Sequence, residues 1–507
     1  MSAPPSATPP PRWLPPWLAL LPAAYVLSPL ALLSLPWLRQ LPRPAWWVLG
    51  FYALSQQLPA LFSPEPFLAS LLALGRTLLM LGLMGVGVAL GDARQLRGMR
   101  WGLALVFLTA LLSSGLGGTD LVIGRLSHPY MTPITLGLAG ALGVWLALFG
   151  AGRLWWRLPF ALLAAGVLLL SGSRGAVAAT LVGGLAGYVL QGGRRWAGGL
   201  LTAAALLAGG FYLGQRLDIG ALTRLGTADV TGRDVLWYNV LSVIQSEPWS
   251  GVGSYRLGTR LTPPGGTCEL FASPSGAVPE CPVWLERLGN PWLIAHNVTL
   301  QQWAETGPLG VLGLFLLLGT ALVAAVQARS ALGLAVMAGL LVATVNDNTL
   351  LVPSPFFAEV FWIVAGASLT RLQFSAPGVG LTAAGLLAAL SLPLFPLLRP
   401  PPAPGTLQLA FLNAPAVAAA SQPYRVLVQF SGPAGNYRAV LRSCPDSCTL
   451  LGSRPFVIQE KASPVLTFET PLVRVRTQPV ELLLYPGSSS RDPRPLGRYR
   501  WEVTQHP

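Results

Sequence analysis

Long apolar runs separated by short polar breaks make up most of this chain. Many of the runs approach or exceed the ~20 residues with which a helix crosses a bilayer. They cover residues 15–38, 44–62, 66–90, 101–116, 131–150, 157–172, 174–190 and 197–214, and then 297–324, 331–352, 356–371 and 378–397. The pattern predicts an all-α polytopic membrane protein with about twelve transmembrane helices.

Polar and proline-rich segments divide the chain into five parts. Residues 1–14 are predicted to be a disordered tail, 15–214 a first set of transmembrane helices, 215–295 a long loop outside the cytoplasm, and 296–398 a second set of helices. Residues 399–507 begin with the proline linker "RPPPAPGT". Strand-like stretches such as "YRVLVQF" and "VELLLYP" follow it and predict a small extracytoplasmic β-domain.

Composition and charge agree with a membrane protein. Only 10% of residues are charged and 52% are hydrophobic, whereas soluble domains carry roughly 25% charged residues. The net charge of +14 could indicate a nucleic-acid-binding protein, but arginines sit in short clusters between the spans, which argues against that class. By the positive-inside rule these clusters are cytoplasmic: Arg39 and Arg43; Arg94, Arg97 and Arg100; Arg153 and Arg157; Arg194 and Arg195; Arg329; Arg371.

This orientation places four polar loops outside, at residues 117–130, 171–175, 215–295 and 346–355. The same parity puts the N-terminus outside as well, unless the proline-interrupted run 15–38 is a hairpin. The sequence leaves both arrangements open.

The four cysteines form two local pairs in segments predicted to be exported. Cys268 and Cys281 lie in the long loop, and Cys444 and Cys448 lie in the β-domain. Two disulfides are the favoured interpretation, although four cysteines allow three pairings. A metal site is the weaker alternative, because no histidine lies near either pair.

Two arginines stand on the predicted outer side, where the positive-inside rule disfavours them. Arg174 lies in "SGSRGA" between two spans, and Arg233 lies in the first turn of an amphipathic helix predicted to begin near Thr231 and end near Glu247. Arg174 has a simpler explanation as an interfacial side chain. A cation gains nothing from the positive end of a helix, so a bound anion explains Arg233 better.

The segment "AHNVTLQQWAETGPLG" begins a helix at the outer surface, with Asn297 or Thr299 as its cap. The positive helix end favours a neutral His296, which can then accept a proton. Asp347 in "TVNDNTL" is a candidate to orient that histidine. An interfacial histidine and a solvated helix end are the structural alternatives. Glu305, two turns into the helix, requires a partner.

Two arginines, a histidine and a carboxylate converge on the outer side, and no metal-ligand pattern accompanies them. Arginine forks suit phosphate oxygens, and a neutral histidine suits the deprotonation of a hydroxyl. These groups match the attack of a hydroxyl on a carrier with a diphosphate leaving group at the membrane surface.

Several motifs resemble those of the bacterial O-antigen ligase and polymerase superfamily. The pattern His-Asn, nine residues, Gly-x-x-Gly is matched by His296–Asn297 and Gly307–Gly310. Ser173–Gly175, Gly232–Trp237 with the loop Pro248–Gly253, and the His-Pro pair at His128 are similar to further motifs. The resemblance covers about residues 15–397, and the β-domain lies outside it.

The resemblance implies a GT-C-type, inverting glycosyltransferase that needs neither metal nor cofactor. It would transfer a glycan from undecaprenyl diphosphate to an acceptor hydroxyl at the outer face of the bacterial inner membrane. His296 would be the base, supported by Asp347, and Arg174 and Arg233 would bind the diphosphate. His128 and Asn297 are assigned to substrate binding through their motifs.

Three acceptors fit the implied enzyme. Lipid A core would make it an O-antigen ligase of lipopolysaccharide biosynthesis, which is the favoured interpretation. A second lipid-linked glycan would make it a polymerase, and a protein hydroxyl an oligosaccharyltransferase. A lipid-linked sugar flippase is the alternative from another class. It should show internal repeats and polar residues at mid-membrane, whereas the polar residues here gather at one face.

Overall fold

The computed structural model describes residues 11–116, 125–191, 233–261, 293–392 and 407–506, with short gaps that are most frequent in the last range. The chain divides into two compact units. One contains residues 1–228 and 243–393, and the other contains 229–242 and 394–507.

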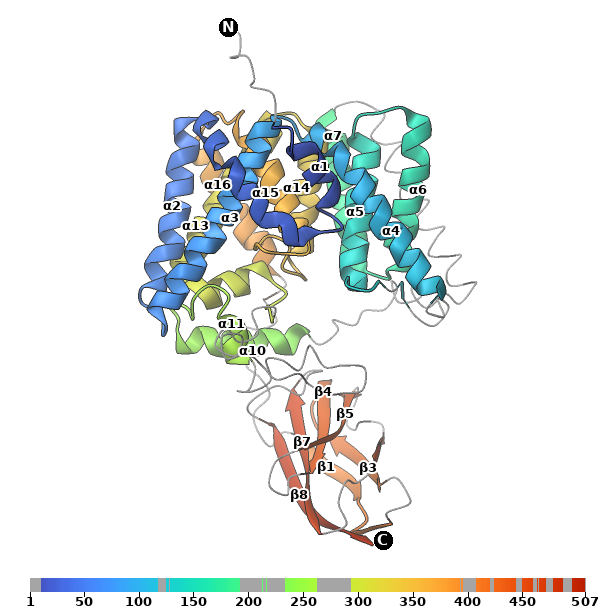
Figure 1. Cartoon of the computed structure of the whole chain (residues 1–507). Coiled ribbons are helices and arrows are strands. Elements are labelled where there is room, and N and C mark those ends of the chain that lie inside the picture. Colours follow the sequence, from blue (N-terminus) through green and yellow to red (C-terminus); the bar gives the residue numbers. More distant parts are fainter. Residues whose placement is uncertain are drawn as a thin grey trace, which may run out of the picture. The chain divides into compact units, whose positions relative to one another are not determined.

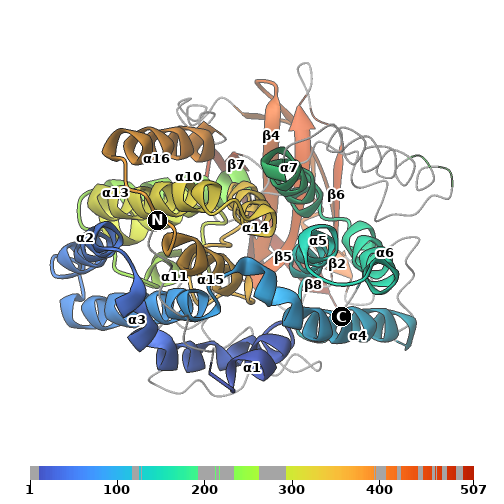
Figure 2. The same cartoon turned by 90° about the horizontal axis from the view of Figure 1, so that it is seen from above.

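The first unit is built from helices of the apolar runs (Figures 1 and 2). It begins with α1 (Leu14–Leu20) and the 3-10 helix η1 (Tyr25–Gln40). The other helices are α2 (Arg43–Ala60), α3 (Pro66–Leu90), η2 (Ala93–Gly98), α4 (Met99–Leu116), α5 (Pro133–Phe149), α6 (Leu154–Leu170), α7 (Arg174–Gln191), α11 (Leu257–Leu261), α13 (Val298–Gln327), α14 (Ala331–Ala343), α15 (Phe357–Leu369) and α16 (Ala376–Ser391). Helix α10 (Arg233–Ser246) belongs partly to each unit.

Three helical segments among the described residues are long and apolar enough to cross a membrane: 66–90, 93–116 and 298–327. Five further apolar helices are shorter. The predicted span 197–214 lies outside the described residues, so the expected number of about twelve crossings stays a prediction. The predicted span 331–352 is helical only to Ala343, after which the chain turns toward Asp347.

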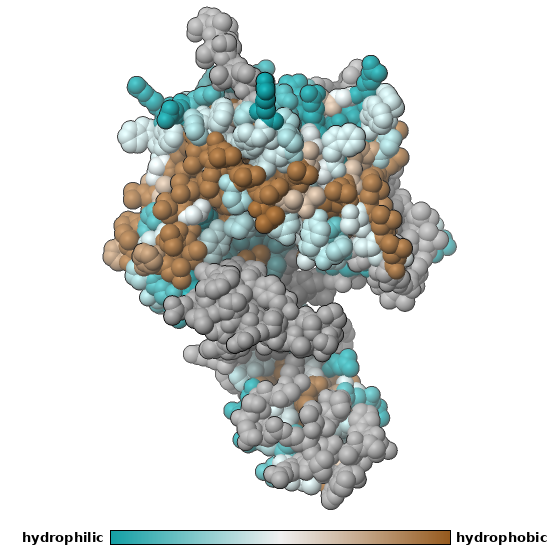
Figure 3. Space-filling model, viewed as in Figure 1, coloured by the Kyte–Doolittle hydropathy of each residue, from teal (hydrophilic) through white to brown (hydrophobic). Residues whose placement is uncertain are grey.

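Large apolar side chains cover the outside of the helical unit. Trp47, Phe67 and Trp101 expose 80%, 84% and 78% of their surface. Figure 3 shows an apolar band across this unit with hydrophilic residues along one edge. A water-soluble protein rarely exposes such a surface, whereas lipid covers it in a bilayer. The helical unit is therefore embedded in a membrane.

The helices alternate in direction, so the unit has two ends. One is the arginine-rich end, which carries Arg43, Arg94, Arg100, Arg329 and Arg371. Helix α2 begins there and α3 and α15 finish there. The other is the His296 end, where α13 begins and α14 finishes.

The N-terminal run is a hairpin. Helix α1 runs parallel to α4, with Gly98 facing the Pro15 carbonyl and Gly102 facing that of Ala19. Helix η1 runs parallel to α3, with Gly82 against Ala31 and Gly85 against Ser34. Since α3 ends where η2 and α4 begin, residues 14–40 enter and return at the arginine-rich end. Of the two arrangements that the sequence leaves open, the structure has the hairpin.

The second unit contains the predicted β region, and its strands form two sheets. One sheet has the strand order β1-β3-β6 and the other β2-β8-β7-β4-β5. The strands are β1 (Gln408–Asn413), β2 (Val417–Ala419), β3 (Tyr424–Ser431), β4 (Gly435–Ser443), β5 (Thr449–Ile458), β6 (Leu466–Thr470), β7 (Gln478–Pro486) and β8 (Gly497–His506). A shared apolar core includes Val428, Phe430 and Leu482. All four cysteines lie outside the described residues, so the disulfide predictions stay predictions.

Candidate functional site

His296 and Asp347 meet at the N-terminal end of α13. The Nδ1 atom of His296 lies 3.2 Å from Oδ1 of Asp347. The His296 side chain is 36% exposed and that of Asp347 is 23% exposed, so the pair is open to a ligand. Residues 51 positions apart thus form the contact that the sequence analysis anticipated.

Asn297 positions this histidine. Its Oδ1 accepts hydrogen bonds from the amides of Thr299 and Leu300, which makes it the N-cap of α13. Its Nδ2 donates to the Val345 carbonyl, next to the end of α14. The residue is fully buried and both polar atoms are engaged by backbone. These contacts hold His296 beside Asp347, and the substrate contact expected of Asn297 from its motif stays a prediction.

The contact with Asp347 also sets the roles of the two ring nitrogens. A carboxylate is an acceptor, so the neutral tautomer that fits this contact has its proton on Nδ1 of His296 and the lone pair on Nε2. The backbone amide of Asn348 also donates to Asp347 Oδ1, at 2.8 Å, which fixes the carboxylate. Nε2 is then the nitrogen that can take a proton from a hydroxyl.

Arg174, the first residue of α7, lies at the same end of the unit as His296. Helices α7 and α14 pack antiparallel through glycines whose added β-carbons would fall within 3 Å of the facing carbonyl oxygens. The pairs are Gly183 with Ala335, Gly187 with Ala331 and Gly339 with Ala179. Each step of four residues along α7 matches four residues back along α14. Arg174 is therefore level with Thr344, whose carbonyl accepts from the Val298 amide.

Arg125 joins this end of the unit, although the sequence analysis did not single it out. Its Nε donates to the Ser171 carbonyl at 2.6 Å, and the next amide, of Leu126, donates to the Leu170 carbonyl. Arg125 therefore lies against the turn that leads into Arg174. The signal that identified Arg174, an arginine in a predicted outer loop, applies equally to Arg125.

His128 follows Arg125 in the same loop. Its Nδ1 accepts from the Tyr130 amide at 3.4 Å, which places the proton on Nε2. That Nε2 is buried and has no hydrogen-bond partner among the described residues. Burial lowers the pKa of His128 below its ordinary value of 6.5. A neutral ring thus presents one unpaired N–H donor.

The amphipathic helix that the sequence predicts before the loop Pro248–Gly253 is present. The helix expected to end near Glu247 is α10, and Arg233 is its first residue. The Arg233 side chain lies outside the described part of the structure, and its convergence with His296 stays a prediction.

The Gly-x-x-Gly half of the signature forms a docking site for the loop Pro248–Gly253. Gly307 has φ 63° and ψ −170°, which interrupts α13, and a β-carbon there would lie 1.9 Å from the Trp249 carbonyl oxygen. Pro308 has no N–H, so the Ala304 carbonyl loses its helical donor. The Val252 amide replaces it at 2.9 Å, and the Gly253 amide donates to the Glu305 carbonyl at 2.9 Å. The two motifs are one structural unit.

Glu305 has its partner in Arg76 of α3. The shortest N–O distance between them is 2.6 Å, and both side chains are at most 2% exposed. Glu305 Oε1 also accepts from the Tyr255 amide at 2.9 Å and from Gln301 Nε2 at 2.7 Å. The Arg76 guanidinium lies 4.0 Å from the centroid of the Tyr255 ring. The network ties the loop to α13.

The same network reaches the residue before His296, because Gln301 Oε1 accepts from the Ala295 amide at 2.6 Å. Sequence reasoning missed Arg76, although an arginine inside the apolar run "LLALGRTLLML" is a signal in itself.

Comparison with known families matches residues 159–315 to the family described as O-Antigen ligase. The matched range includes Arg174, Arg233, His296 and both motifs of the docking unit. No curated protein matches the chain.

Proposed function

From membership of the O-antigen ligase and polymerase superfamily, which the match at 159–315 supports, we propose that this chain is a glycosyltransferase. It transfers a glycan from a polyprenyl diphosphate, undecaprenyl diphosphate in bacteria, to an acceptor hydroxyl. The observation that carries the proposal is the contact of His296 with Asp347 at the N-terminal end of α13.

In the proposed reaction, His296 Nε2 takes the proton of the acceptor hydroxyl. The oxygen attacks the anomeric carbon of the glycan from the face opposite the diphosphate, so the configuration inverts. The bond from that carbon to the phosphate oxygen breaks, and its electron pair leaves with the polyprenyl diphosphate. The imidazolium that forms is stabilised by Asp347 and returns its proton to water.

Arginines at the same end supply the counter-charge for the leaving group. Arg174 and Arg125 adjoin one turn, and Arg233 is the third candidate. Guanidinium forks bind phosphate oxygens bidentately and stabilise charge that develops on them, a role that a metal ion fills in other enzymes. The Nε2–H of His128 is a neutral donor for a substrate oxygen.

Within this proposal the acceptor is lipid A core, which defines a ligase. The test is reconstitution of the full chain in liposomes with a defined undecaprenyl-diphosphate-linked glycan. Lipid A core, a second lipid-linked glycan and a serine-containing peptide are offered in turn, each with and without EDTA. Product on lipid A core alone, unchanged by EDTA, is the expected result. Product on another acceptor would reassign the enzyme to polymerase or protein glycosylation, and loss with EDTA would refute metal independence.

A further inference from the structure

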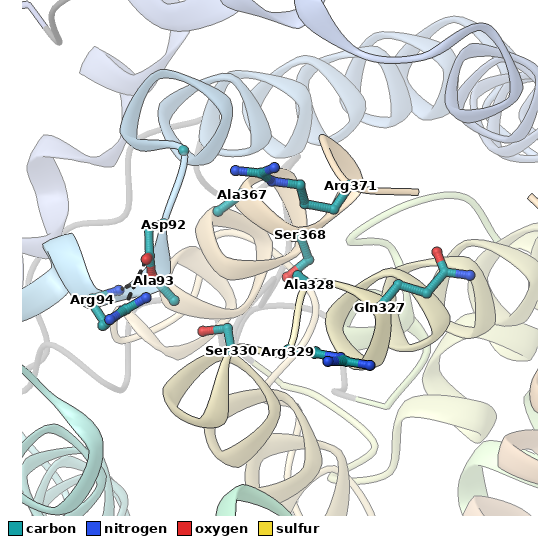
Figure 4. A pocket seen from close by; sticks show the side chains of 11 residues that line it. Asp92, Ala93, Arg94, Gln327, Ala328, Arg329, Ser330, Ala367, Ser368 and Arg371 are labelled. Carbon is teal, nitrogen blue, oxygen red and sulfur yellow. Dashed lines mark hydrogen bonds and ion pairs between the residues drawn. The ribbon is translucent and has the colours of Figure 1, made fainter. Parts of the chain in front are cut away.

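A hollow of about 240 Å³ opens at the arginine-rich end, remote from the proposed glycosyltransferase site. It lies where α3, α13 and α15 end and where η2 and α14 begin (Figure 4). Its lining residues are Gly91, Asp92, Ala93, Arg94, Gln327, Ala328, Arg329, Ser330, Ala367, Ser368 and Arg371. Helix α13 alone separates Gln327 from Val298 by roughly 45 Å at 1.5 Å per residue.

The charges around the hollow do not cancel. Asp92 is its one lining carboxylate, and it pairs with Arg94 at 3.0 Å. Arg329 and Arg371 have no ion-pair partner among the described residues, so they leave two positive charges at its rim. Ser330 Oγ accepts from the Gly333 amide and keeps its own proton for a ligand. Two guanidinium groups and a hydroxyl are donors that suit a phosphate.

Arg329 has a backbone conformation that is unfavourable for any residue with a side chain. The residue has φ 49°, in the left-handed region, directly after the C-cap of α13. Glycine is the usual residue there, because a β-carbon is strained in this conformation. An arginine near a helix C-terminus gains from the helix dipole, but that gain is no larger than the strain. The arginine side chain is kept at a position where the backbone favours glycine.

The rim of the hollow is also adjacent to the lipid-facing surface. Gln327 and Gln373 are joined by two reciprocal hydrogen bonds of 2.7 and 2.8 Å, which hold the start of the α15–α16 connection at the rim. The next residue, Phe374, exposes 44% of its surface, and Trp101 after η2 exposes 78%. A ligand with both a phosphate and an apolar tail fits this surface.

We propose that this hollow binds the phosphate of an anionic phospholipid headgroup from the surrounding leaflet. Arg329 and Arg371 bind the phosphate oxygens, and the acyl chains lie against the apolar surface beside Phe374. The site is independent of glycan transfer, and its occupancy is measured without any activity.

The test uses the full-length chain purified in mild detergent and titrated with phosphatidylglycerol, with phosphatidylcholine or with inorganic phosphate. Native mass spectrometry counts bound lipids, and the thermal midpoint reports stabilisation by binding. We expect phosphatidylglycerol to bind and raise the midpoint, and phosphatidylcholine to do neither. A pair of arginines is worth roughly a 30-fold change in affinity near an anionic lipid surface, at about fivefold each.

The informative variant combines Arg329→Gly with Arg371→Gln. Glycine relieves the strained backbone at 329, so the variant should fold, and it should bind phosphatidylglycerol about 30-fold more weakly. Arg39→Gln is the control, because Arg39 lies at the same end but does not line the hollow. Unchanged lipid binding by the double variant overturns the proposal. An equal midpoint shift with inorganic phosphate alone assigns the site to a soluble anion and overturns the lipid.

Discussion

His296 Nδ1 lies 3.2 Å from Asp347 Oδ1, and the two residues reach this contact from opposite directions. His296 precedes the first turn of α13, and Asp347 follows the last turn of α14. The side-chain Nδ2 of Asn297 donates to the Val345 carbonyl and connects the two segments. The contact orients the ring so that Nε2 faces away from the carboxylate, which is the arrangement a general base requires.

Asp347→Asn should lower the rate of glycan transfer by about 10²-fold or more, with little effect on donor affinity. An asparagine amide can donate to Nδ1, which stabilises the tautomer whose Nε2 carries a proton. Steady-state kinetics of the purified variant against wild type test this, with circular dichroism as the check on folding. A variant with wild-type kcat would remove Asp347 from the mechanism.

Gly307→Ala should release the loop Pro248–Gly253 from α13, because the new β-carbon would lie 1.9 Å from the Trp249 carbonyl oxygen. A non-glycine residue at this φ and ψ adds about 1–3 kcal/mol of strain. We expect a lower thermal midpoint and increased proteolysis within the loop. Gly50→Ala is the matched control, because nothing lies within 4 Å of its β-carbon and alanine favours the helix. Equal midpoints for the two variants would contradict this role of Gly307.

Glu305→Gln should destabilise the fold by about 3–5 kcal/mol, because it leaves the Arg76 guanidinium buried without a counter-charge. Replacing both partners, with Arg76→Met and Glu305→Leu, should recover much of that loss. Chemical denaturation in detergent measures both. Asp92→Asn is the control, since Asp92 and Arg94 are 39% and 68% exposed in their pair and such surface pairs contribute at most about 1 kcal/mol. A Glu305→Gln variant no less stable than Asp92→Asn would exclude a stabilising pair.

The lowered pKa of His128 predicts a pH-dependent stability. The folded state keeps the ring neutral, so below the ordinary value of 6.5 the unfolded state binds a proton first. Stability is therefore complete above that pH and falls as the pH approaches the lower folded pKa. Between pH 7 and pH 5, the thermal midpoint of the wild type should fall more than that of His128→Gln. A difference that does not change with pH would show that His128 is not buried as a neutral group.

Hydropathy predicts most of the helices, because a bilayer demands long apolar segments whatever their tertiary contacts. Helix α3 covers Pro66–Leu90, the run read from the sequence. Hydropathy does not locate the end of α14, because the chain leaves the helix at Thr344 to bring Asp347 to His296 while the apolar run continues. Hydropathy also could not show that residues 14–40 form a hairpin. That arrangement depends on the packing of α1 against α4, which no local pattern encodes.

The candidate site was predictable where a residue is unusual for its place. His296 and Arg174 are polar residues at the threshold of apolar runs, so they were found. The role of Pro308 was not predictable from the sequence. Pro308 lacks the N–H that would bind the Ala304 carbonyl, and the Val252 amide, 56 positions before Pro308, binds that carbonyl instead. The partner of Glu305 required the α3 and α13 packing that places Arg76 beside it.

The most direct test of the account separates chemistry from donor binding at His296. Wild type and His296→Ala are reconstituted with an undecaprenyl-diphosphate-linked glycan and lipid A core, and release of undecaprenyl diphosphate is followed in a single turnover. The account predicts that His296→Ala binds the donor with wild-type affinity but releases the diphosphate about 10²–10⁴-fold more slowly. Release by His296→Ala at the wild-type rate would contradict His296 as the base.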